Sequence, residues 1–461
     1  MTTAQKPRVF IIGGGFGGLA AAKALAKAPV EVVVVDRRNY HLFQPLLYQV
    51  ATAALSPADI SSPIRTILRD QKNCDVALAE VVGVNLADRR LIFNGGYIPY
   101  DYLVLATGAT HAYFGHDEWC HYAPGLKGIE DAIELRRRIL LAFESAEYEG
   151  SDEARRATLT FGIVGAGPTG VELAGAVKEI AGKTIPQDYK HIDTRTTRVI
   201  LFQGGDRVLP GFAPELSDRA KRDLERLGVE VRLNSRVTNV TPEGVYINNG
   251  EFFPVRNIFW AAGVRANRLG RSLGVPLDWS GRVIVGPDLT VPGHPEVFVI
   301  GDLAAATSAD TGLPLPGVAQ AAIQMGQYAG QCIAREVAGK STPAMRQPFV
   351  YRDKGSVAVI GKWRAVVQIG KFKFGGFPAW LLWGGIHIAF LVGFRNRLAV
   401  LGRWVWNWLI NARDARLITG PSQIAIARPR PPEFVVQAQP SGEVVQADAH
   451  PADREVAQPA R

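Results

Sequence analysis

The sequence predicts an α/β fold made of two similar units, each with a parallel sheet between helices. A glycine-rich turn follows a short apolar strand at residues 9–12, and a second such turn follows residues 161–164. Further buried strands are predicted at residues 102–108, 258–263 and 297–300, with helix-forming segments between them. The 461 residues are enough for about two to four domains with a sizeable core.

Both turns have the spacing G-x-G-x-x-G between an apolar strand and a helix-forming segment. Their glycines are Gly13, Gly15, Gly17 and Gly18 in the first turn and Gly165, Gly167 and Gly170 in the second. In this context the first glycine makes a tight turn, the second admits a pyrophosphate, and the third allows close packing of helix and strand. The pyrophosphate then lies at a helix N-terminus, where free N–H groups favour anions. Two such turns predict two Rossmann-like domains, each holding a dinucleotide, that meet across a cleft.

The residue at the end of the next strand differs between the two copies. Asp36 ends the strand at residues 31–35, where a carboxylate can accept a hydrogen bond from a ribose hydroxyl. The second copy has Gln203 after the strand at residues 198–202. A neutral amide helps a ribose less than a carboxylate does, but it also repels a 2′-phosphate less. The second site is therefore predicted to take NADH, with NADPH as a second possibility.

The three cysteines, Cys74, Cys120 and Cys332, are far apart and form no C-x-x-C pair. This spacing argues against a disulfide scaffold, a zinc site and a redox dithiol. We predict no metal site. We also expect no secretory signal, because the first strand begins at Arg8.

The positive charge of the chain is concentrated near its C-terminus. Between residues 351 and 420 there are eleven Lys or Arg and two Asp, an excess equal to the net charge of +9 of the whole chain. Six of the nine tryptophans lie in the same stretch. Trp and Arg or Lys beside an apolar run are typical of a segment at a membrane interface. A nucleic-acid surface is less favoured, because the aromatic residues stand among Leu, Ile and Val.

Two helices are expected in this region. Residues 377–394 are nearly uncharged, but they are short for a spanning helix and contain Pro378 and the Gly384-Gly385 pair. We therefore expect a helix that lies on the bilayer or dips into it. The apolar face predicted for the following helix consists of Phe394, Leu398, Leu401, Val405, Trp408 and Ala412. The alternative is a surface helix packed on the protein's own core or on a dimer partner.

These landmarks divide the chain into five parts. The predicted boundaries are 1–112 for the first part of the first dinucleotide-binding domain, 113–290 for the second dinucleotide-binding domain (core about 155–285), 291–350 for the second part of the first domain, 351–427 for the membrane-associating region and 428–461 for a disordered tail. The tail is assigned from its Pro-, Ala- and Gln-rich composition.

Longer sequence segments indicate the family more specifically. Residues 39–51, 106–115, 319–324 and 393–397, taken with the two glycine turns, resemble the type II (alternative) NADH:quinone oxidoreductases. The resemblance runs from about residue 8 to residue 420. It implies a flavoenzyme of the pyridine nucleotide-disulfide oxidoreductase-like superfamily. Such an enzyme passes a hydride from NADH to FAD and two electrons to a membrane quinone, without pumping protons.

The resemblance also implies roles for residues. For FAD it implies Gly13, Gly15, Gly17, Gly18, Asp36, Arg37, Gln44, Thr107, Gly108, Gly301, Asp302 and the helix that starts at Ala319. For NADH it implies Gly165, Gly167, Gly170, Gln203, Ala262 and Gly263. Glu172 corresponds to an acid near the nicotinamide, and Gln320 and Gln324 to a pair at the quinone pocket. The simpler interpretations are a helix-start acid for Glu172 and a solvated helix face for the two glutamines.

Other functions remain open. The alternatives are a flavoprotein NAD(P)H dehydrogenase that does not use quinone and an enzyme like the sulfide:quinone oxidoreductases, which need reactive cysteines near the flavin. Disulfide reductases need a dithiol that is absent here, and soluble ferredoxin reductases do not explain the C-terminal region. A flavoprotein without enzymatic activity is the alternative from another class. We expect a peripheral protein on the cytoplasmic face of the cell membrane, with a homodimer possible and no nucleic acid bound.

Overall fold

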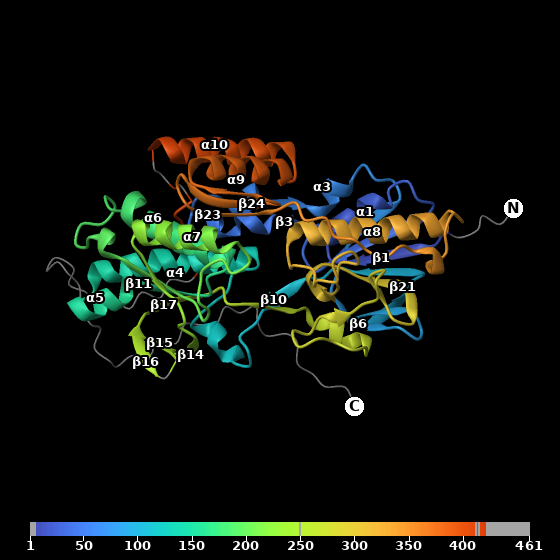
Figure 1. Cartoon of the computed structure of the whole chain (residues 1–461), viewed down its shortest axis with the longest axis horizontal. Helices are drawn as coiled ribbons and strands as arrows, with labels where there is room; N and C mark the ends of the chain where they lie inside the picture. Colours follow the sequence, from blue (N-terminus) through green and yellow to red (C-terminus); the bar gives the residue numbers. More distant parts are fainter. Residues whose placement is uncertain (1–5, 249, 411–412, 414, 421–461) are drawn as a thin grey trace, which may run out of the picture.

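A computed structural model describes the chain except for residues 1–5, 249, 411–412, 414 and 421–461. The predicted tail, 428–461, therefore lies outside the described residues. The molecule has two lobes side by side, and helices α9 (Phe377–Phe390) and α10 (Phe394–Ile410) lie across the top (Figure 1).

The first lobe contains a six-stranded sheet in the order β20-β21-β9-β1-β2-β5. Its strands are β20 (Thr290–Val291), β21 (His294–Val299), β9 (Tyr102–Leu105), β1 (Arg8–Ile12), β2 (Glu31–Asp36) and β5 (Cys74–Leu78). All neighbours are parallel except β20 and β21. Helices α1 (Phe16–Ala24) and α8 (Ala319–Val337) pack together closely, since a Cβ on Gly326 would lie 2.1 Å from the Gly17 carbonyl oxygen. A meander of β6 (Val81–Asn85), β7 (Arg90–Phe93) and β8 (Gly96–Pro99) completes this lobe.

The second lobe repeats the pattern on a smaller scale. Its parallel sheet has the order β13-β12-β11-β17. The strands are β13 (Val229–Arg232), β12 (Arg198–Phe202), β11 (Thr160–Val164) and β17 (Asn257–Trp260). The helices are α4 (Ile129–Tyr148), α5 (Asp152–Thr158), α6 (Pro168–Glu179) and α7 (Pro214–Leu227). A second meander contains β14 (Val237–Val240), β15 (Gly244–Ile247) and β16 (Glu251–Pro254).

Two chain segments connect the lobes. These are β10 (Ala109–His111) and β18 (Val264–Ala266), which pair in antiparallel fashion near the middle of the molecule (Figure 1). The remaining short strands and α-helices are β3 (Tyr40–Leu42), α2 (Leu47–Ala51), β4 (Ser61–Pro63), α3 (Ile64–Leu68), β19 (Val283–Ile284) and β22 (Ala304–Ala305), and a π-helical turn at Ile180–Thr184 continues α6. The pairing of β10 with β18 fixes how the carboxyl ends of the two sheets face one another.

The C-terminal region is part of the folded core. An antiparallel sheet of β23 (Ser356–Gly361), β24 (Arg364–Ile369) and β25 (Phe372–Gly375) packs on α6, and α9 and α10 follow it. Trp380, Trp383 and Trp404 are buried in the same apolar cluster as the second sheet. Helix α10 also reaches the first lobe, where Asn396 Nδ2 donates to Ser61 O at 3.0 Å. These helices therefore bridge the two lobes.

The predicted C-terminal helices differ from the observed ones in detail. The first helix ends at Phe390 rather than Phe394. Gly393, with φ +89°, has a left-handed backbone conformation that separates this helix from α10. No helix within the described ranges combines the length and apolar character needed to cross a bilayer. Phe394, Leu398, Leu401 and Val405 are exposed, in agreement with the predicted apolar face, and Ala412 lies outside the described residues.

Trp408 does not share the exposure of that face. Its ring centroid lies 4.4 Å from that of Trp380, and it packs against the core. Trp408 therefore lies at the boundary between the exposed side of α10 and the side packed on the core. The two interpretations of α10 are therefore combined in one helix, which packs one side on the core and exposes the other.

Gly175 sets how closely α6 approaches β23. A Cβ at this position would lie 1.8 Å from the carbonyl oxygen of Ile360, which is backbone and cannot rotate away. We expect Gly175→Ala to lower the free energy of unfolding by about 1–3 kcal/mol or more, as overpacked core positions do. Gly182→Ala is the matched control, because nothing lies within 4 Å of its Cβ position. Equal urea midpoints for the two variants would contradict this account of the contact.

Candidate functional site

The first glycine turn has the geometry of a cradle for a phosphate group. Gly13 has φ +108°, and a Cβ there would lie 2.5 Å from Ala106 O. A Cβ on Gly18 would lie 1.8 Å from Gly13 O, so α1 and β1 can only approach this closely without a side chain. Gly15 has nothing within 4 Å of its Cβ position, which leaves space above the N-terminus of α1. The three glycines thus have the three roles that a dinucleotide turn requires.

Asp36 is fixed at the rim of this turn. Its Oδ2 accepts from Gly14 N at 2.6 Å, and its Oδ1 accepts from Arg38 N at 2.8 Å. The carboxylate is thereby oriented at the end of β2, where a ribose would lie. The neighbouring Arg37 is largely exposed and lies 3.8 Å from Glu80, so its guanidinium is directed to the surface rather than hydrogen-bonded to the turn.

Further predicted residues gather at the carboxyl ends of β9 and β21. The buried hydroxyl of Thr107 has no hydrogen-bond partner among the described residues, and Gly108 has φ +67° with open space at its Cβ position. Asp302 Oδ2 lies 3.9 Å from Lys127 Nζ, and Gln44 Nε2 donates to Lys127 O at 3.2 Å. A buried hydroxyl without a partner, a cationic amine and a carboxylate at one strand edge fit the polar groups of a bound flavin nucleotide. Lys127 was missed in the sequence, because no motif marks it.

Two other predicted residues complete this edge. Gly301 has φ +66°, and a Cβ there would lie 3.4 Å from the Cβ of Ala322 on α8. Ala319 is the first residue of α8, with Val318 as its N-cap. The N-terminus of a long helix is therefore aimed at the end of the sheet, where its dipole favours negative charge.

The second glycine turn has the same backbone conformation and the same close contacts as the first. Gly165 has φ +100°, and a Cβ there would lie 2.5 Å from Ala262 Cα. The Cβ position of Gly170 lies 1.8 Å from Gly165 O, and nothing lies within 4 Å of that of Gly167. Gly263 follows at the end of β17, where Phe114 covers it, with its Cζ 2.9 Å from the Cβ position. The second lobe therefore presents a second phosphate cradle.

Gln203 takes the place of Asp36 in the second turn. Its Oε1 accepts from Ala166 N at 3.0 Å, the counterpart of the bond between Asp36 and Gly14 N. The amide makes the same structural contact without the negative charge.

Gln320 and Gln324 lie on one face of α8, as their spacing predicts, but their amides bind backbone rather than water. Gln324 accepts from Arg352 N and donates to Arg352 O, both at 3.0 Å. Gln320 donates to Gly355 O at 2.9 Å and accepts from Lys354 N at 3.1 Å. Both amides therefore have backbone partners, although the side chains are only half-buried. The pair fixes the extended segment at residues 352–355 on the first lobe.

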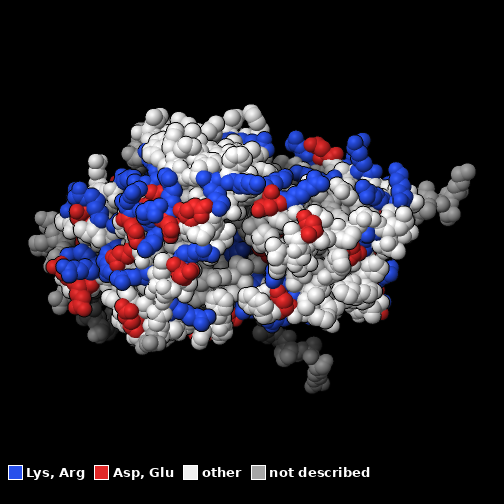
Figure 2. All heavy atoms as spheres, in the orientation of Figure 1, with Lys and Arg blue, Asp and Glu red and all other residues white. Residues whose placement is uncertain are grey.

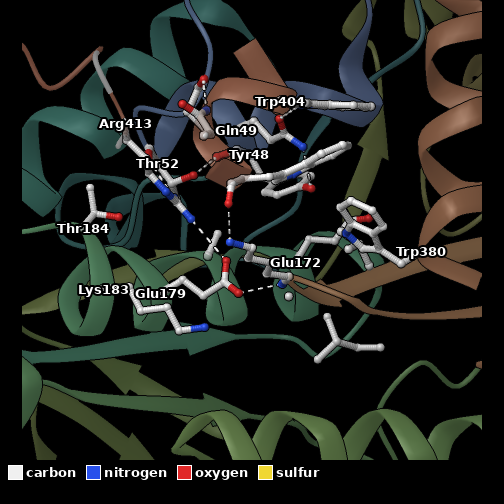
Figure 3. A pocket seen from close by; sticks show the side chains of 18 of the residues that line it. Tyr48, Gln49, Thr52, Glu172, Glu179, Lys183, Thr184, Trp380, Trp404 and Arg413 are labelled. Atoms are coloured by element: carbon white, nitrogen blue, oxygen red, sulfur yellow. Dashed lines mark hydrogen bonds and ion pairs between the residues drawn. The ribbon is translucent and has the colours of Figure 1, made fainter. Parts of the chain in front are cut away.

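A cavity of about 110 Å³ lies where residues of α2, α6, β23, α9 and α10 come together (Figure 3). Its walls come from α2, from α6 and the π-helical turn after it, from β23, and from α9 and α10. The lining includes Tyr48, Gln49, Glu172, Glu179, Val359, Trp380, Trp383, Trp404, Trp408 and Arg413. Trp404 Nε1 donates to Gln49 Oε1 at 2.7 Å, and Gln49 Nε2 donates to Tyr48 Oη at 2.9 Å. The lining also contains Thr52, Lys183, Thr184, Lys362 and Asn407, so the tryptophans face polar and charged groups. This arrangement is suited to a flat ligand that carries polar substituents.

Glu172 is the acid predicted just after the second turn, and it lies on the wall of this cavity (Figure 3). Burial raises the pKa of its carboxyl to about 8, although the backbone N–H of Val359 hydrogen-bonds it and opposes the shift. The carboxyl therefore holds a proton at neutral pH. A proton held beside an apolar cavity is available to a ligand that gains negative charge there.

Arg413 closes one side of the cavity. Its guanidinium donates to Thr52 O at 3.0 Å and lies 3.3 Å from Glu179 Oε2. Glu179 Oε1 also accepts from Lys362 N at 2.6 Å. The C-terminal segment is thus tied to both lobes at this point (Figure 3).

A row of ring contacts connects the first turn with the cavity wall. Phe16 lies 5.9 Å from Phe43, which lies 6.1 Å from His387, and His387 lies 4.6 Å from Trp383, all between ring centroids. His387 Nδ1 donates to Trp383 O at 2.7 Å, and burial lowers its pKa to about 4, so the ring is neutral at pH 7. The sequence shows these aromatic residues but not that they touch.

Comparison with known proteins gives consistent results. The model of the family "Pyridine nucleotide-disulphide oxidoreductase" matches residues 7–326. The chain is 46% identical over 444 residues to type II NADH:quinone oxidoreductase Ndh of Mycobacterium tuberculosis, covering 93% of this chain and 94% of that protein. It is 47% identical to NdhA of the same organism over 438 residues, covering 91% of each chain.

Solved structures with lower identity share the fold. NDH2 from Plasmodium falciparum in complex with NADH has a TM-score of 0.81 at 21% identity, covering 90% of this chain and all of that one. Sulfide:quinone oxidoreductase from Aquifex aeolicus has a TM-score of 0.68 at 17% identity, covering 85% and 92% of the two chains.

The pKa of Glu172 makes stability depend on pH. The folded carboxyl keeps its proton to about pH 8, whereas the unfolded one loses it near pH 4.5, so wild-type stability falls between these values as pH rises. Glu172→Gln removes this dependence. Between pH 4.5 and pH 8, the free energy of unfolding of the variant is expected to rise by roughly 3–5 kcal/mol relative to that of the wild type. Urea unfolding at several pH values measures this difference. Parallel curves for the two proteins would contradict a protonated Glu172.

Proposed function

The chain belongs to the type II NADH:quinone oxidoreductases of the pyridine nucleotide-disulphide oxidoreductase family, and we propose that its two turns and its aromatic cavity carry out that reaction. NADH is oxidised and a quinone is reduced, without proton pumping. The observation that carries the proposal is the pair of matching phosphate cradles with an apolar cavity beside them. When bound, FAD supplies the redox chemistry, because it can accept a hydride and return two electrons.

The first lobe would hold FAD. The open space at Gly15 and the N-terminus of α1 suit the pyrophosphate, and the fixed carboxylate of Asp36 suits the adenosine ribose. Thr107 and Asp302 offer a hydroxyl and a carboxylate toward the flavin end. The complete proposed set is Gly13, Gly15, Gly17, Gly18, Asp36, Arg37, Gln44, Thr107, Gly108, Gly301, Asp302 and Ala319.

The second lobe would hold NADH. The proposed residues are Gly165, Gly167, Gly170, Gln203, Ala262 and Gly263. Because Gln203 carries no charge, NADPH is proposed as a second donor.

The cavity would admit the quinone head group. Reduction of a quinone to a quinol consumes two protons, and Glu172 holds one on the cavity wall at neutral pH. Gln320 and Gln324 fix residues 352–355, the segment that leads into β23 and so into the wall of the cavity. We therefore assign Glu172 as a proton source and the two glutamines as positioning residues.

The exposed side of the C-terminal helices would face the membrane. Exposed apolar residues there are Phe377, Leu381, Phe390, Phe394, Leu398, Leu401, Val405, Trp406 and Leu409. Figure 2 shows this crest nearly free of charge, with Lys and Arg gathered beneath it. An apolar crest above a basic band is suited to an anionic lipid surface, and we propose the cytoplasmic face of the cell membrane.

An enzyme like the sulfide:quinone oxidoreductases is less well supported. Such an enzyme needs reactive cysteines near the flavin, and no cysteine lines the cavity in the described part of the chain. Cys74 lies on β5, at the edge of the first sheet, where burial raises the pKa of its thiol to about 11. A thiol in that state is a weak nucleophile.

Stopped-flow measurements on Gln324→Ala test the role of the glutamine pair. Loss of the two bonds to Arg352 frees the segment, so we expect reoxidation by quinone to slow roughly tenfold. Reduction of the flavin by NADH is expected to stay within about twofold. Gln327→Ala on the same helix is the control, because that side chain is exposed. Equal losses in both half-reactions would contradict the assignment, and a wild type whose flavin NADH does not reduce would overturn the function itself.

Vesicle flotation tests the membrane surface. Phe394 and Leu409 are 75% and 74% exposed, and burying each in lipid is worth about 2 kcal/mol. The double variant Phe394→Ser with Leu409→Ser is expected to bind phosphatidylcholine–phosphatidylglycerol vesicles at least tenfold more weakly. Leu78→Ser, at the sheet edge of the first lobe and 63% exposed, is the control. Unchanged flotation of the double variant would show that another surface binds lipid.

A further inference from the structure

The loop after β12 lies where the adenosine ribose of the nicotinamide nucleotide is expected, at the carboxyl end of the next strand after the glycine turn. Gln203 Oε1 is occupied by Ala166 N, so its Nε2 is the amide group left to face a ligand, and it lies 3.1 Å from the Cβ position of Gly205. This side chain therefore presents a donor at the rim of the site. The equivalent carboxylate, Asp36 in the first lobe, has only acceptors.

Arg236 packs against the same loop from the neighbouring chain segment. Its Cα and Cβ lie 3.8 Å from the Cβ position of Gly204, and its Cγ lies 4.0 Å from it. The two segments are joined by hydrogen bonds from Ser235 N to Gln203 O at 2.8 Å and from Asn234 N to Gly205 O at 2.9 Å. The stem of Arg236 is thus held beside the rim.

Asn248 fixes the backbone of Arg236 from the other side. Arg236 N donates to Asn248 Oδ1 at 2.9 Å, and Asn248 N donates to Arg236 O at 2.8 Å. Asn248 Nδ2 also donates to Asn234 O at 3.0 Å. The position of the arginine is therefore built into the fold, although its side chain is exposed.

The charges around the rim favour an added anion. Arg236 has no ion-pair partner within the described ranges, and Arg207 follows on the same loop. Glu230, the acid on the adjacent β13, is already engaged by Arg198 at 2.8 Å and by Arg232 at 4.0 Å. Asp206 is the acid within the loop, and it is exposed. An arginine with a free guanidinium is the residue best matched to a phosphate group.

We propose that Arg236, with the Nε2 of Gln203, binds the 2′-phosphate of NADPH and thereby lets the enzyme use NADPH as well as NADH. The proposal rests on the proposed function, because it assumes that the second lobe holds the nicotinamide nucleotide. It adds a residue that determines which form of that nucleotide is accepted.

The experiment compares kcat/KM for NADPH and NADH in the wild type, Arg236→Gln and Gln203→Glu. A charge-assisted bond to phosphate corresponds to roughly tenfold or more in affinity, so Arg236→Gln should lower kcat/KM for NADPH by at least that factor. NADH turnover should stay within about twofold. Gln203→Glu should reduce NADPH use as well, because a carboxylate repels the phosphate. The control is Arg195→Gln, which removes an exposed charge at the opposite end of β12, where Arg195 pairs with Asp193.

Binding of 2′,5′-ADP and 5′-AMP by calorimetry tests the proposal independently of turnover. The wild type should bind 2′,5′-ADP more tightly, and Arg236→Gln should remove that preference while 5′-AMP binding stays unchanged. Equal losses for both nucleotides, or no preference in the wild type, would overturn the role of Arg236. A wild type that binds 2′,5′-ADP as expected but oxidises no nucleotide would overturn the proposed function and leave this site intact.

Discussion

The rest of the structure depends on the absence of a side chain at the three glycines of each G-x-G-x-x-G turn. Helices α1 and α6 can start against their strands only because Gly18 and Gly170 place no Cβ 1.8 Å from a carbonyl oxygen. That approach aims each helix N-terminus at the open space above Gly15 or Gly167. Two copies of one turn thus give each lobe a helix N-terminus at the ends of its strands, and the pairing of β10 with β18 joins the two lobes.

The C-terminal helices combine two tasks in one element. Their inner side carries buried tryptophans and a hydrogen bond from Trp404 to Gln49 of the first lobe. Arg413, which follows α10 in the sequence, contacts Glu179 of the second lobe. Their outer side is apolar and exposed. Because the same helices form a wall of the cavity and the proposed membrane surface, a lipid-soluble substrate would have a short path from the bilayer to Glu172.

The two lobes differ in the residue at the end of the strand after each glycine turn. Asp36 and Gln203 accept the same backbone hydrogen bond in their turns, so the fold tolerates either side chain. The charge is therefore free to vary with the ligand. A carboxylate is suited to a ribose with free hydroxyls, and the role proposed for the amide and the adjacent Arg236 is to accept a phosphate. Under this proposal, selectivity between nucleotides can change without a change in the fold.

The sequence by itself determined the features that arise from neighbouring residues. The strand before each turn, the glycine spacing, Gln203 at the end of β12 and the start of α8 at Ala319 all lie where local patterns predicted them. Only the tertiary structure decided which distant residues meet. Trp404 donates a hydrogen bond to Gln49, which lies 355 residues earlier in the sequence. The pKa of Glu172 is raised because elements from distant parts of the chain bury its carboxyl. Turn conformation and helix periodicity depend on a few consecutive residues, whereas burial and cavity walls depend on segments whose separation in the sequence carries no signal.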